Sequence, residues 1–537
     1  MPTGKRVREL RNQQRRRNRE NVKAGNVPKP TPGGPTTSEK QQSRRNTAAN
    51  RKAREGRAKA TEPCSVEKAL VHSNKKKGET VNLTGGLVRL MYYESLLANS
   101  IRATYTYTDS GNATNNQKTG TSCNNTATAV DGLPIVGEEK MDLIFTDNRG
   151  NKLKLEMYVN KVTPFDDETT KSVAQLDLVS KEFIINEKGQ SRVKVCMEGK
   201  ISEHIEKILK QYLKTTKKLD IEETGAKNYN FIGNNKKPFW TMNNLSTKAA
   251  PKKNKPGNTA GFLLYETADG YHFKSLDTLL GQKKKKSIIY NQTAEGVTTR
   301  VPAGYDLKAL EYSRNSAVNV QGKHMMGAYS TRCISFNPFN CEYSESILSA
   351  DTSKASTASD SKGNQKELTL AGKNFWQSNA EFDSEELNNS FTRTTWNIKD
   401  TGTLMGGETK QQIDKSKEEN FELENIFNQS IQRYQQLFGQ VSTVTVGGDF
   451  SLHAGDAVFI DAPKLEANTK ASNWNPESGG VYVIADIAHY IAPNGTYTKM
   501  NLIRDSVGRK GTHTSRGSGT EDFHGIKVPR SSGSNFL

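Results

Sequence analysis

Residues 480–504 read GVYVIADIAHYIAPNGTYTKMNLIR, and this stretch decides the fold. The section alternates between strand-like runs and turns, and it predicts strands at Val481–Tyr490 and Thr496–Arg504. Pro493-Asn494-Gly495 between them has the composition of a tight hairpin turn. The stretch therefore predicts an antiparallel hairpin. Shorter runs upstream predict two further strands of the same β-domain, at Val441–Val446 and Ala457–Asp461.

A distant part of the chain has the same order of features as this C-terminal β-domain. Gly137-Glu138 introduces a strand that ends at Ile144–Asp147, as Gly455-Asp456 introduces Val458–Asp461. A second apolar run, a proline and a third strand follow in each case: Tyr158–Val162, Thr163-Pro164 and Gln175–Val179 in the first, and Val483–Ile487, Ala492-Pro493 and Lys499–Ile503 in the second. This order predicts a duplicated β-domain whose loops differ in length.

The rest of the body mixes strands with two helices. Alternation predicts further strands at Ile101–Thr108, Glu139–Thr146, Lys152–Val162 and Ser172–Val179. Ser202–Leu213 is predicted to be a helix because its apolar residues share one face, and a second helix is predicted over Glu418–Phe438, before Gly439. We therefore expect an α+β fold that is mainly β, with two antiparallel β-barrel or sandwich domains and α/β segments that link them.

The positive charge is concentrated at the N-terminus. The chain has 537 residues and a net charge of +19, and residues 1–77 hold 22 Lys+Arg against 6 Asp+Glu. The other 460 residues carry a net charge of only +3. Residues 1–77 contain no Phe, Tyr or Trp, so they lack the apolar surface that would offset the entropy lost on folding. We expect a solvated basic arm, with the ordered body beginning at Val81.

Such an arm favours contact with an anionic partner, either nucleic acid or an acidic protein surface. The arm has two helix-prone basic stretches, Arg6–Lys23 and Glu39–Lys59. The candidate contact residues are basic side chains of these stretches: Arg15, Arg16, Arg17, Arg19, Arg44, Arg45, Arg51, Lys52 and Arg54.

Two classes of protein are excluded by composition. No stretch approaches the ~20 apolar residues of a membrane span, and no apolar signal region follows the basic N-terminus, so we expect neither an integral membrane protein nor a Sec-secreted one. The cysteines are odd in number and scattered, which favours free thiols in a reducing compartment. They are Cys64, Cys123, Cys196, Cys333 and Cys341.

No motif supports an enzyme, a metal site or a cofactor. The sequence contains no nucleophile elbow, no phosphate-binding loop and no dinucleotide-binding glycine turn. Asp166-Asp167-Glu168 is a carboxylate cluster, but we expect it in a loop with no positioned partner. Gly233–Lys237 resembles a phosphate cradle only superficially, since Pro238-Phe239-Trp240 favours a packed surface turn. His453 and His489 lie among apolar neighbours, and we expect both to be structural.

Several stretches together resemble the central hub subunits of the baseplate in contractile-tailed bacteriophages, which are related to the hub part of type VI secretion spike proteins. The stretches occur in the same order as in that family over about Val81–Lys510, and this collinearity is the specific part of the resemblance. They are Leu90–Leu97, Ile101–Thr104, Asp109–Gly111, Leu133–Glu139, Phe183–Lys188, Phe231–Phe239, Gly270–Asp277, Gly448–Asp456 and Leu502–Ser506. The basic arm and the C-terminal tail lie outside it.

The resemblance implies a structural protein of the virion, located in the tail baseplate and assembled in the host cytoplasm. In that family two domains of each subunit resemble the tail tube, so a homotrimer presents six tube-like domains. The ring would adapt the sixfold tube to the trimeric central spike and surround the lumen for DNA ejection. The implied partners are the tail tube or tube-initiator protein, the central spike, and the baseplate wedge and tape-measure proteins.

With this family in mind we divide the chain into six segments. They are a basic arm (1–77), a first tube-like β-domain (78–185), a helix-containing α/β segment (186–257), a second mixed α/β domain (258–375), a helix with the second tube-like β-domain (376–510) and a flexible Gly/Ser-rich tail (511–537).

Two other functions stay open at the level of sequence. The first is a nucleic-acid-binding protein that acts through its arginine-rich arm, which is compatible with a hub whose arm contacts DNA or an acidic tail protein. The second is a cell-wall hydrolase, which the lack of a credible acid and nucleophile pair makes the weakest of the three.

Overall fold

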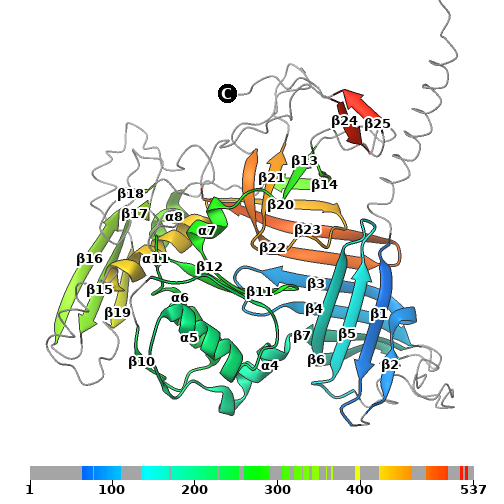
Figure 1. The fold of residues 1–537 in the computed structure, drawn as a ribbon, viewed down its shortest axis with the longest axis horizontal. Helices are drawn as coiled ribbons and strands as arrows, with labels where there is room; N and C mark the ends of the chain where they lie inside the picture. The colour runs from blue at the N-terminus through cyan, green and yellow to red at the C-terminus, as the bar shows by residue number, and fades with distance from the viewer. Residues whose placement is uncertain are drawn as a thin grey trace, which may run out of the picture. The chain divides into compact units, whose positions relative to one another are not determined.

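The structure is a computed structural model. It describes residues 63–75, 78–109, 135–167, 172–225, 229–252, 259–290, 305–314, 320–328, 330–337, 341–349, 358–359, 365–366, 393–398, 423–462, 479–505, 520–523 and 526–529. The chain divides into two compact units, residues 1–55 with 520–528, and residues 56–519 with 529–537. The first unit contributes strand β24 (Thr520–Phe523), which pairs with β25 (Ile526–Pro529). All other described elements belong to the second unit (Figure 1).

The first β-domain is a curved antiparallel sheet in the order β2-β1-β5-β6-β7-β4-β3. Its strands are β1 (Ser65–His72), β2 (Thr80–Asn82), β3 (Leu87–Ser95), β4 (Arg102–Asp109), β5 (Lys140–Thr146), β6 (Lys152–Asp167) and β7 (Ser172–Val179). Alternate residues of β5 are buried, as the period of two predicts. The buried side chains, Tyr92, Tyr105 and Phe145 among them, form one hydrophobic core.

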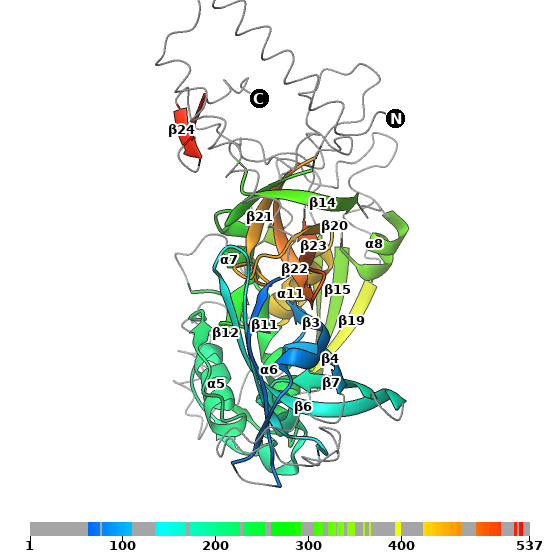
Figure 2. The same cartoon turned by 90° about the vertical axis from the view of Figure 1, so that its right-hand side faces the viewer.

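The second β-domain is a closed six-stranded barrel (Figures 1 and 2). Its strands are β13 (Lys286–Ile289), β14 (Leu307–Arg314), β20 (Gln440–Gly447), β21 (Ala457–Asp461), β22 (Gly480–Ala492) and β23 (Gly495–Arg504). They pair in the order β22-β21-β13-β14-β20-β23, and β23 pairs back with β22 to close the ring. The interior is filled by apolar side chains such as Val444, Ile460 and Tyr482.

The strand pairing confirms the predicted repeat. The order β5-β6-β7-β4-β3 in the first domain corresponds to β21-β22-β23-β20-β14 in the second, antiparallel throughout. Both domains also carry a β-bulge at the same two places, Leu87/Arg89 and Val159/Lys161 in the first and Ala309/Glu311 and Ile484/Asp486 in the second. A bulge adds one residue and bends the strand, so matched bulges give the two domains the same curvature.

The entry to the repeated strand is matched as well. The N–H of Val159 donates to the carbonyl of Glu139, and Glu138 donates back to Val159. The second domain repeats this exchange, with Ile484 donating to Asp456 and Gly455 donating to Ile484. The residue that donates to the repeated strand, Glu138 or Gly455, has a positive φ of 62° or 90°, so the first domain has a glutamate where the second has the glycine that this conformation favours.

The two β-domains form one continuous sheet. Strand β3 pairs with β4 on one side and, antiparallel, with β22 on the other, from Leu90 opposite Ile491 to Ser95 opposite Asp486. The result is a 13-stranded sheet. The outermost strands of the first domain are β2 and β3, and β3 joins the first domain to the closed barrel.

A mixed α/β segment follows the first β-domain in the chain. Its elements include α4 (Lys181–Glu187), β8 (Cys196–Met197), α5 (Ile201–Lys207), β9 (Leu219–Ile221), β10 (Phe231–Ile232), α6 (Pro238–Ser246), β11 (Phe262–Thr267), β12 (Gly270–Ser275) and α7 (Leu276–Gly281). The helix predicted at Ser202–Leu213 begins as α5 and continues as a π-helical turn, η4 (Ile208–Tyr212). Its apolar face packs with β11 and β12 in a separate core.

A third sheet packs on the long helix α11 (Leu423–Leu437), which lies within the helix predicted at Glu418–Phe438. Its strands are β15 (Ser330–Asn337), β16 (Glu342–Ser349) and β19 (Arg393–Ile398), in the order β16-β15-β19. Helix α8 (Val320–Met326) contacts β19 of this sheet. Two short strands, β17 (Ala358–Ser359) and β18 (Gln365–Lys366), pair with each other, and β17 contacts α11. Among the described helices, none is both long and apolar enough to cross a bilayer.

Three sequence expectations need correction. Strand β1 begins at Ser65, before the start of the body expected at Val81, and its Ala69 and Val71 alternate into the core although basic residues follow them closely. The second barrel takes β13 and β14 from the region predicted as a separate mixed domain, 258–375, because they close the sheet. Asp166 and Asp167 lie in strand β6, not in a loop, because both pair with β7.

Candidate functional site

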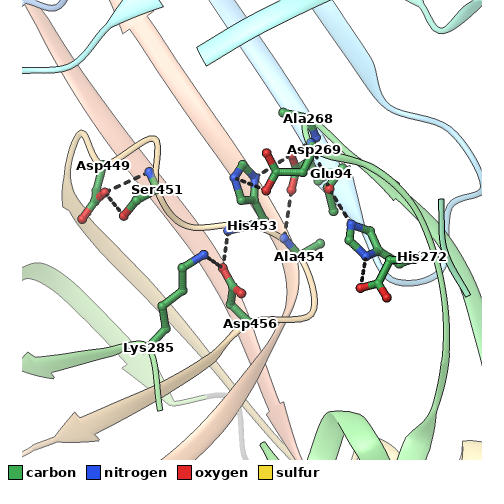
Figure 3. Close-up of polar contacts among 12 residues, drawn as sticks. Glu94, Ala268, Asp269, His272, Lys285, Asp449, Ser451, His453, Ala454 and Asp456 are labelled. Carbon is green, nitrogen blue, oxygen red and sulfur yellow. Dashed lines mark hydrogen bonds and ion pairs between the residues drawn. The ribbon is translucent and has the colours of Figure 1, made fainter. Parts of the chain in front are cut away.

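A buried carboxylate connects three parts of the fold. Glu94 on β3 has a fully buried side chain and accepts hydrogen bonds from the Tyr92 hydroxyl (2.7 Å) and from the N–H groups of Ala268 (2.8 Å) and Ala454 (2.9 Å). His453 Nδ1 lies 3.1 Å from Glu94 Oε1 (Figure 3). Ala268 belongs to the turn between β11 and β12, and Ala454 precedes β21. Glu94 therefore joins the first β-domain, the α/β segment and the second barrel.

We call Glu94, Ala268, Asp269, His453 and Ala454 the polar junction. His453 Nε2 lies 3.6 Å from Asp269 Oδ2, so the imidazole stands between two carboxylates. Burial would lower the pKa of His453, but Glu94 and then Asp269 outweigh it and raise the pKa above its ordinary value. Burial would raise the pKa of Glu94, but His453 and the two N–H donors outweigh it and lower the pKa. Glu94 and His453 therefore form a charged, hydrogen-bonded pair at the centre of the polar junction.

A neighbouring histidine has the opposite electrostatics. His489 on β22 is buried between Tyr92, which stacks on it at 6.0 Å, and Phe450, which meets it edge-on at 5.3 Å. Its Nδ1 lies 2.9 Å from the Thr498 hydroxyl. Burial lowers the pKa of His489 to about 4, so this imidazole is neutral at physiological pH.

A cavity of about 270 Å³ opens beside the junction. The acidic side chains that line it have basic partners. Asp220 lies 2.6 Å from Lys274 Nζ and 3.4 Å from His272 Nδ1, and Asp456 lies 2.7 Å from Lys285 Nζ. Within the described residues, no group of three or more His, Cys, Asp and Glu side chains could hold a metal ion. The cavity thus presents paired charges, and we assign it no catalytic step.

Two further contacts hold the same parts together. Lys217 Nζ lies between two buried carboxylates, 2.5 Å from Glu266 and 2.8 Å from Glu182, and Glu266 also accepts the N–H of Ile101 beside β4. Burial would lower the pKa of Lys217, but the two carboxylates outweigh it and raise the pKa. The Lys217 ion pairs therefore lie within the α/β segment, and the hydrogen bond from Ile101 to the Glu266 carboxylate ties that segment to the first β-domain, as Glu94 does.

The hairpin turn between β5 and β6 reaches the second barrel directly. Arg149 Nη1 lies 2.8 Å from the buried Asp449, and the N–H of Phe450 donates to Asp147 at 3.0 Å. Together with the β3–β22 pairing, these contacts hold the two β-domains side by side. The site as a whole is an interface between domains.

Only some of the residues singled out in the sequence lie within the described part of the structure. The nine basic residues of the arm lie outside the described residues: Arg15, Arg16, Arg17, Arg19, Arg44, Arg45, Arg51, Lys52 and Arg54. Asn235 in the Gly233–Lys237 stretch has a φ of 60°, and the N–H of Gly233 donates to the carbonyl of Val195. Pro238-Phe239-Trp240, expected in a packed surface turn, instead begins helix α6. Cys64, Cys196, Cys333 and Cys341 form no disulfide within the part of the chain that the structure describes. Cys123 lies outside the described residues.

Sequence reasoning missed Glu94. It stands inside Leu90–Leu97, where its neighbours indicate a strand but nothing marks its side chain as buried. The available signal is its position: alternation from Leu90 and Tyr92 places Glu94 on the buried face of β3. A carboxylate on a buried face needs partners, and apart from Tyr92 those partners come from residues more than 170 positions away.

No protein-family model matches the chain, and no curated protein matches it. Solved structures do match it, and they are tail proteins and type VI secretion proteins. The 43 kDa tail protein of prophage MuSo2 from Shewanella oneidensis has a TM-score of 0.42 at 10% identity, over 82% of this chain and 100% of that one. A tail protein from Neisseria meningitidis MC58 has a TM-score of 0.42 at 9% identity, over 82% and 99%.

The E. coli c3393 protein, described as a type VI secretion component with structural similarity to the T4 bacteriophage tail proteins gp27 and gp5, has a TM-score of 0.36 at 9% identity, over 81% of this chain and 79% of that one.

Proposed function

We propose that this chain is a structural hub subunit of a contractile phage tail baseplate, and that three copies form a ring between the tail tube and the central spike. The observation that carries the proposal is the duplication: one chain holds two β-domains with the same strand pairing and the same two bulges. Three such chains would present six equivalent domains. That number lets one object contact a sixfold partner on one side and a threefold partner on the other.

The way the two domains are joined supports a ring. Strand β3 of the first domain pairs with β22 of the second, so the domains lie edge to edge through main-chain hydrogen bonds. Edge-to-edge pairing is how β-domains assemble side by side, because it satisfies strand edges that would otherwise attract other chains. The polar junction and the Arg149–Asp449 ion pair then fix their relative orientation. A rigid pair of domains suits a load-carrying adaptor.

The remaining parts of the proposal rest on the sequence resemblance. We assign the chain to the virion tail, with the tube or tube-initiator protein, the spike, the wedge and the tape-measure protein as partners. The DNA would leave through the lumen of the ring. The proposal assigns the chain no catalytic step and no cofactor.

Mass measurement tests the ring. One chain weighs 59.5 kDa, so light scattering on the eluted full-length protein should give about 180 kDa for a closed trimer. Negative-stain images of the same fraction should show threefold particles with six peripheral lobes. A protein that stays at 59.5 kDa across micromolar concentrations, with no affinity for purified tube or spike subunits, contradicts the proposal.

A second function is favoured by the charge distribution alone. Residues 1–77 carry 22 of the basic residues and most of the net charge, which suits electrostatic contact with DNA. This function is compatible with a hub, since the arm and the β-domains are different parts of the chain.

A further inference from the structure

The third sheet has its apolar side outward. Strand β15 pairs antiparallel with β16 and parallel with β19, which places residues of the three strands in rows across one face. The rows are Tyr343–Phe336–Ile398, Glu345–Ile334–Trp396 and Ile347–Arg332–Thr394. Six of these nine side chains are large and apolar, so this face, which we call the outer face, has the composition of a domain core.

Within the described part of the chain, five of the six large apolar side chains of the outer face are exposed, and Ile334 at its centre is buried at 8%. The exposed fraction is 75% for Trp396, 72% for Tyr343 and 67% for Ile398, and Ile347 and Phe336 are also exposed. Large aromatic side chains at such exposure are uncommon on the surface of a protein that works alone. Their gathering on three adjacent strands makes one continuous patch.

The opposite face of the same sheet is polar and buried. Thr331 and Ser335 of β15 point toward α11 and are almost fully buried. Asn428 of α11 accepts the Thr331 hydroxyl at 2.6 Å and donates to the carbonyls of Thr331 and Ser346. A sheet of a monomer normally buries its apolar face and exposes its polar one. Here the arrangement is reversed, so the outer face is built to be covered by something else.

The size and charge of the outer face indicate what covers it. At roughly 150–250 Å² for each aromatic side chain, the exposed residues present on the order of 600 Å². A stable protein–protein interface takes about 800 Å² from each partner, so the patch is most of one side of such an interface. Its two charges neutralise each other, since Arg332 Nε lies 2.6 Å from Glu345 Oε1. A neutral apolar face fits another protein surface without excess charge. Residues 78–537 of this same chain offer such a surface, since their net charge is only +3 over 460 residues.

We propose that the outer face of the β16-β15-β19 sheet packs against a second copy of this chain. The proposal rests on the self-association assigned above and names a surface that carries it, in addition to the edges of the two β-domains. A closed ring needs each copy to offer its neighbour a fixed surface of this size. Sheet faces pack about 10 Å apart when their side chains interdigitate, which would enclose Trp396 and Ile398 completely.

Two exposed isoleucines provide a matched test in the full-length chain. Ile398→Glu places a charge in the proposed contact, whereas Ile232→Glu places the same charge on β10, where the isoleucine is 64% exposed against 67% for Ile398. Sedimentation velocity should show that Ile398→Glu raises the dissociation constant of the assembly at least tenfold, while Ile232→Glu leaves it unchanged. Unfolding temperatures of the two variants should match the parent, since neither side chain belongs to a core.

A fluorescence measurement tests the contact without a disruptive charge. The contribution of Trp396, taken as the difference between the parent and Trp396→Phe, should shift to shorter wavelength as the parent is concentrated through its assembly. An assembled parent whose Ile398→Glu variant assembles equally well, with no shift of Trp396, overturns this inference and leaves the ring intact. Equal disruption by both glutamates also overturns it. A parent that stays monomeric at every concentration contradicts the ring and this inference together.

Discussion

At the scale of single residues, Glu94 holds the domains together because its carboxylate is buried and charged. Glu94→Gln keeps the shape but removes the negative charge that faces His453. We expect a loss of about 3 kcal/mol in the free energy of unfolding, because one partner of a buried ion pair is left uncompensated. Urea titration followed by tryptophan fluorescence measures this loss.

Glu156→Gln is the matched control for this change. Glu156 lies on strand β6 of the same sheet, is 54% exposed and pairs with Lys140 at 2.8 Å. Exposed ion pairs contribute about 0–1 kcal/mol, so this variant should stay within that range of the parent. Equal losses for Glu94→Gln and Glu156→Gln would show that the junction contributes no more than a surface pair.

The two buried histidines should give stability an opposite dependence on pH. Because the pKa of His453 is raised on folding, its contribution is complete below about pH 6.5 and is lost as pH rises through the raised value. The pKa of His489 is lowered to about 4 in the folded protein, whereas an unfolded histidine is protonated below about pH 6.5. As pH falls from about 6.5 toward 4, this histidine is therefore protonated in the unfolded chain but not in the folded one, and stability is lost.

Substitutions separate these two effects. His489→Phe, which can keep the stacking on Tyr92, should flatten the dependence of unfolding free energy on pH between 4 and 6.5. His453→Gln should leave that acid slope in place and flatten the slope above pH 6.5 instead. Urea titrations at half-unit pH steps measure both slopes, and an acid slope that persists in His489→Phe contradicts the assignment.

At the scale of elements, local patterns predicted eight of the 13 strands of the two β-domains and the helices at α5 and α11. Alternation is a local signal, so Ala457–Asp461 and Ser172–Val179 have the predicted bounds. Strand β1 was missed because its buried residues, Ala69 and Val71, are small and lie close to a lysine run. The polar junction could not be predicted, since its members meet only when β3, the β11–β12 turn and the segment before β21 are folded together.

The matched bulges make a prediction for the second barrel. Leu310 is the extra residue between Ala309 and Glu311 of β14, and its side chain is 46% exposed. Deleting Leu310 should shift the preceding residues of β14 by one position and turn the buried Leu307 outward. We expect the free energy of unfolding to fall by about 2–3 kcal/mol because that side chain becomes exposed. Leu310→Ser keeps the extra backbone residue and should change the unfolding temperature little.

Val88 is the equivalent residue of the first β-domain, between Leu87 and Arg89 of β3. Only the half-buried Leu87 of that strand precedes it, so deleting Val88 should destabilise the protein less than deleting Leu310. Thermal unfolding of the two deletions and of Leu310→Ser checks this order. A Leu310→Ser variant as unstable as the deletion would assign the effect to the side chain and not to the bulge.

At the scale of the whole molecule, the structure moves the boundary between arm and body. Strand β1 pairs with β2 and β5, and it lies inside the segment 1–77 that the charge marks as an arm. Removing residues 1–62 should leave the unfolding temperature unchanged, because the first described strand begins at Ser65. Removing residues 1–77 should lower it sharply and expose the edge of β5 to aggregation. Scanning calorimetry with light scattering on both truncations tells these outcomes apart, and two equally stable truncations would contradict the role of β1.

The truncation that keeps β1 also isolates the charge. Residues 1–62 hold 18 Lys+Arg and 5 Asp+Glu, so their removal takes away +13 of the net charge of +19 and leaves the β-domains whole. We expect the full-length chain to bind duplex DNA with an affinity that falls about a hundredfold or more between 50 and 200 mM salt, because binding would release counterions from the phosphates. The chain without residues 1–62 should bind at least tenfold more weakly at 50 mM salt and show a much shallower salt dependence. Fluorescence anisotropy with a labelled duplex measures both. Affinity that survives the truncation would place the DNA contact on the body, whose charge is nearly neutral, and an affinity of the full chain that ignores salt would rule out an electrostatic arm.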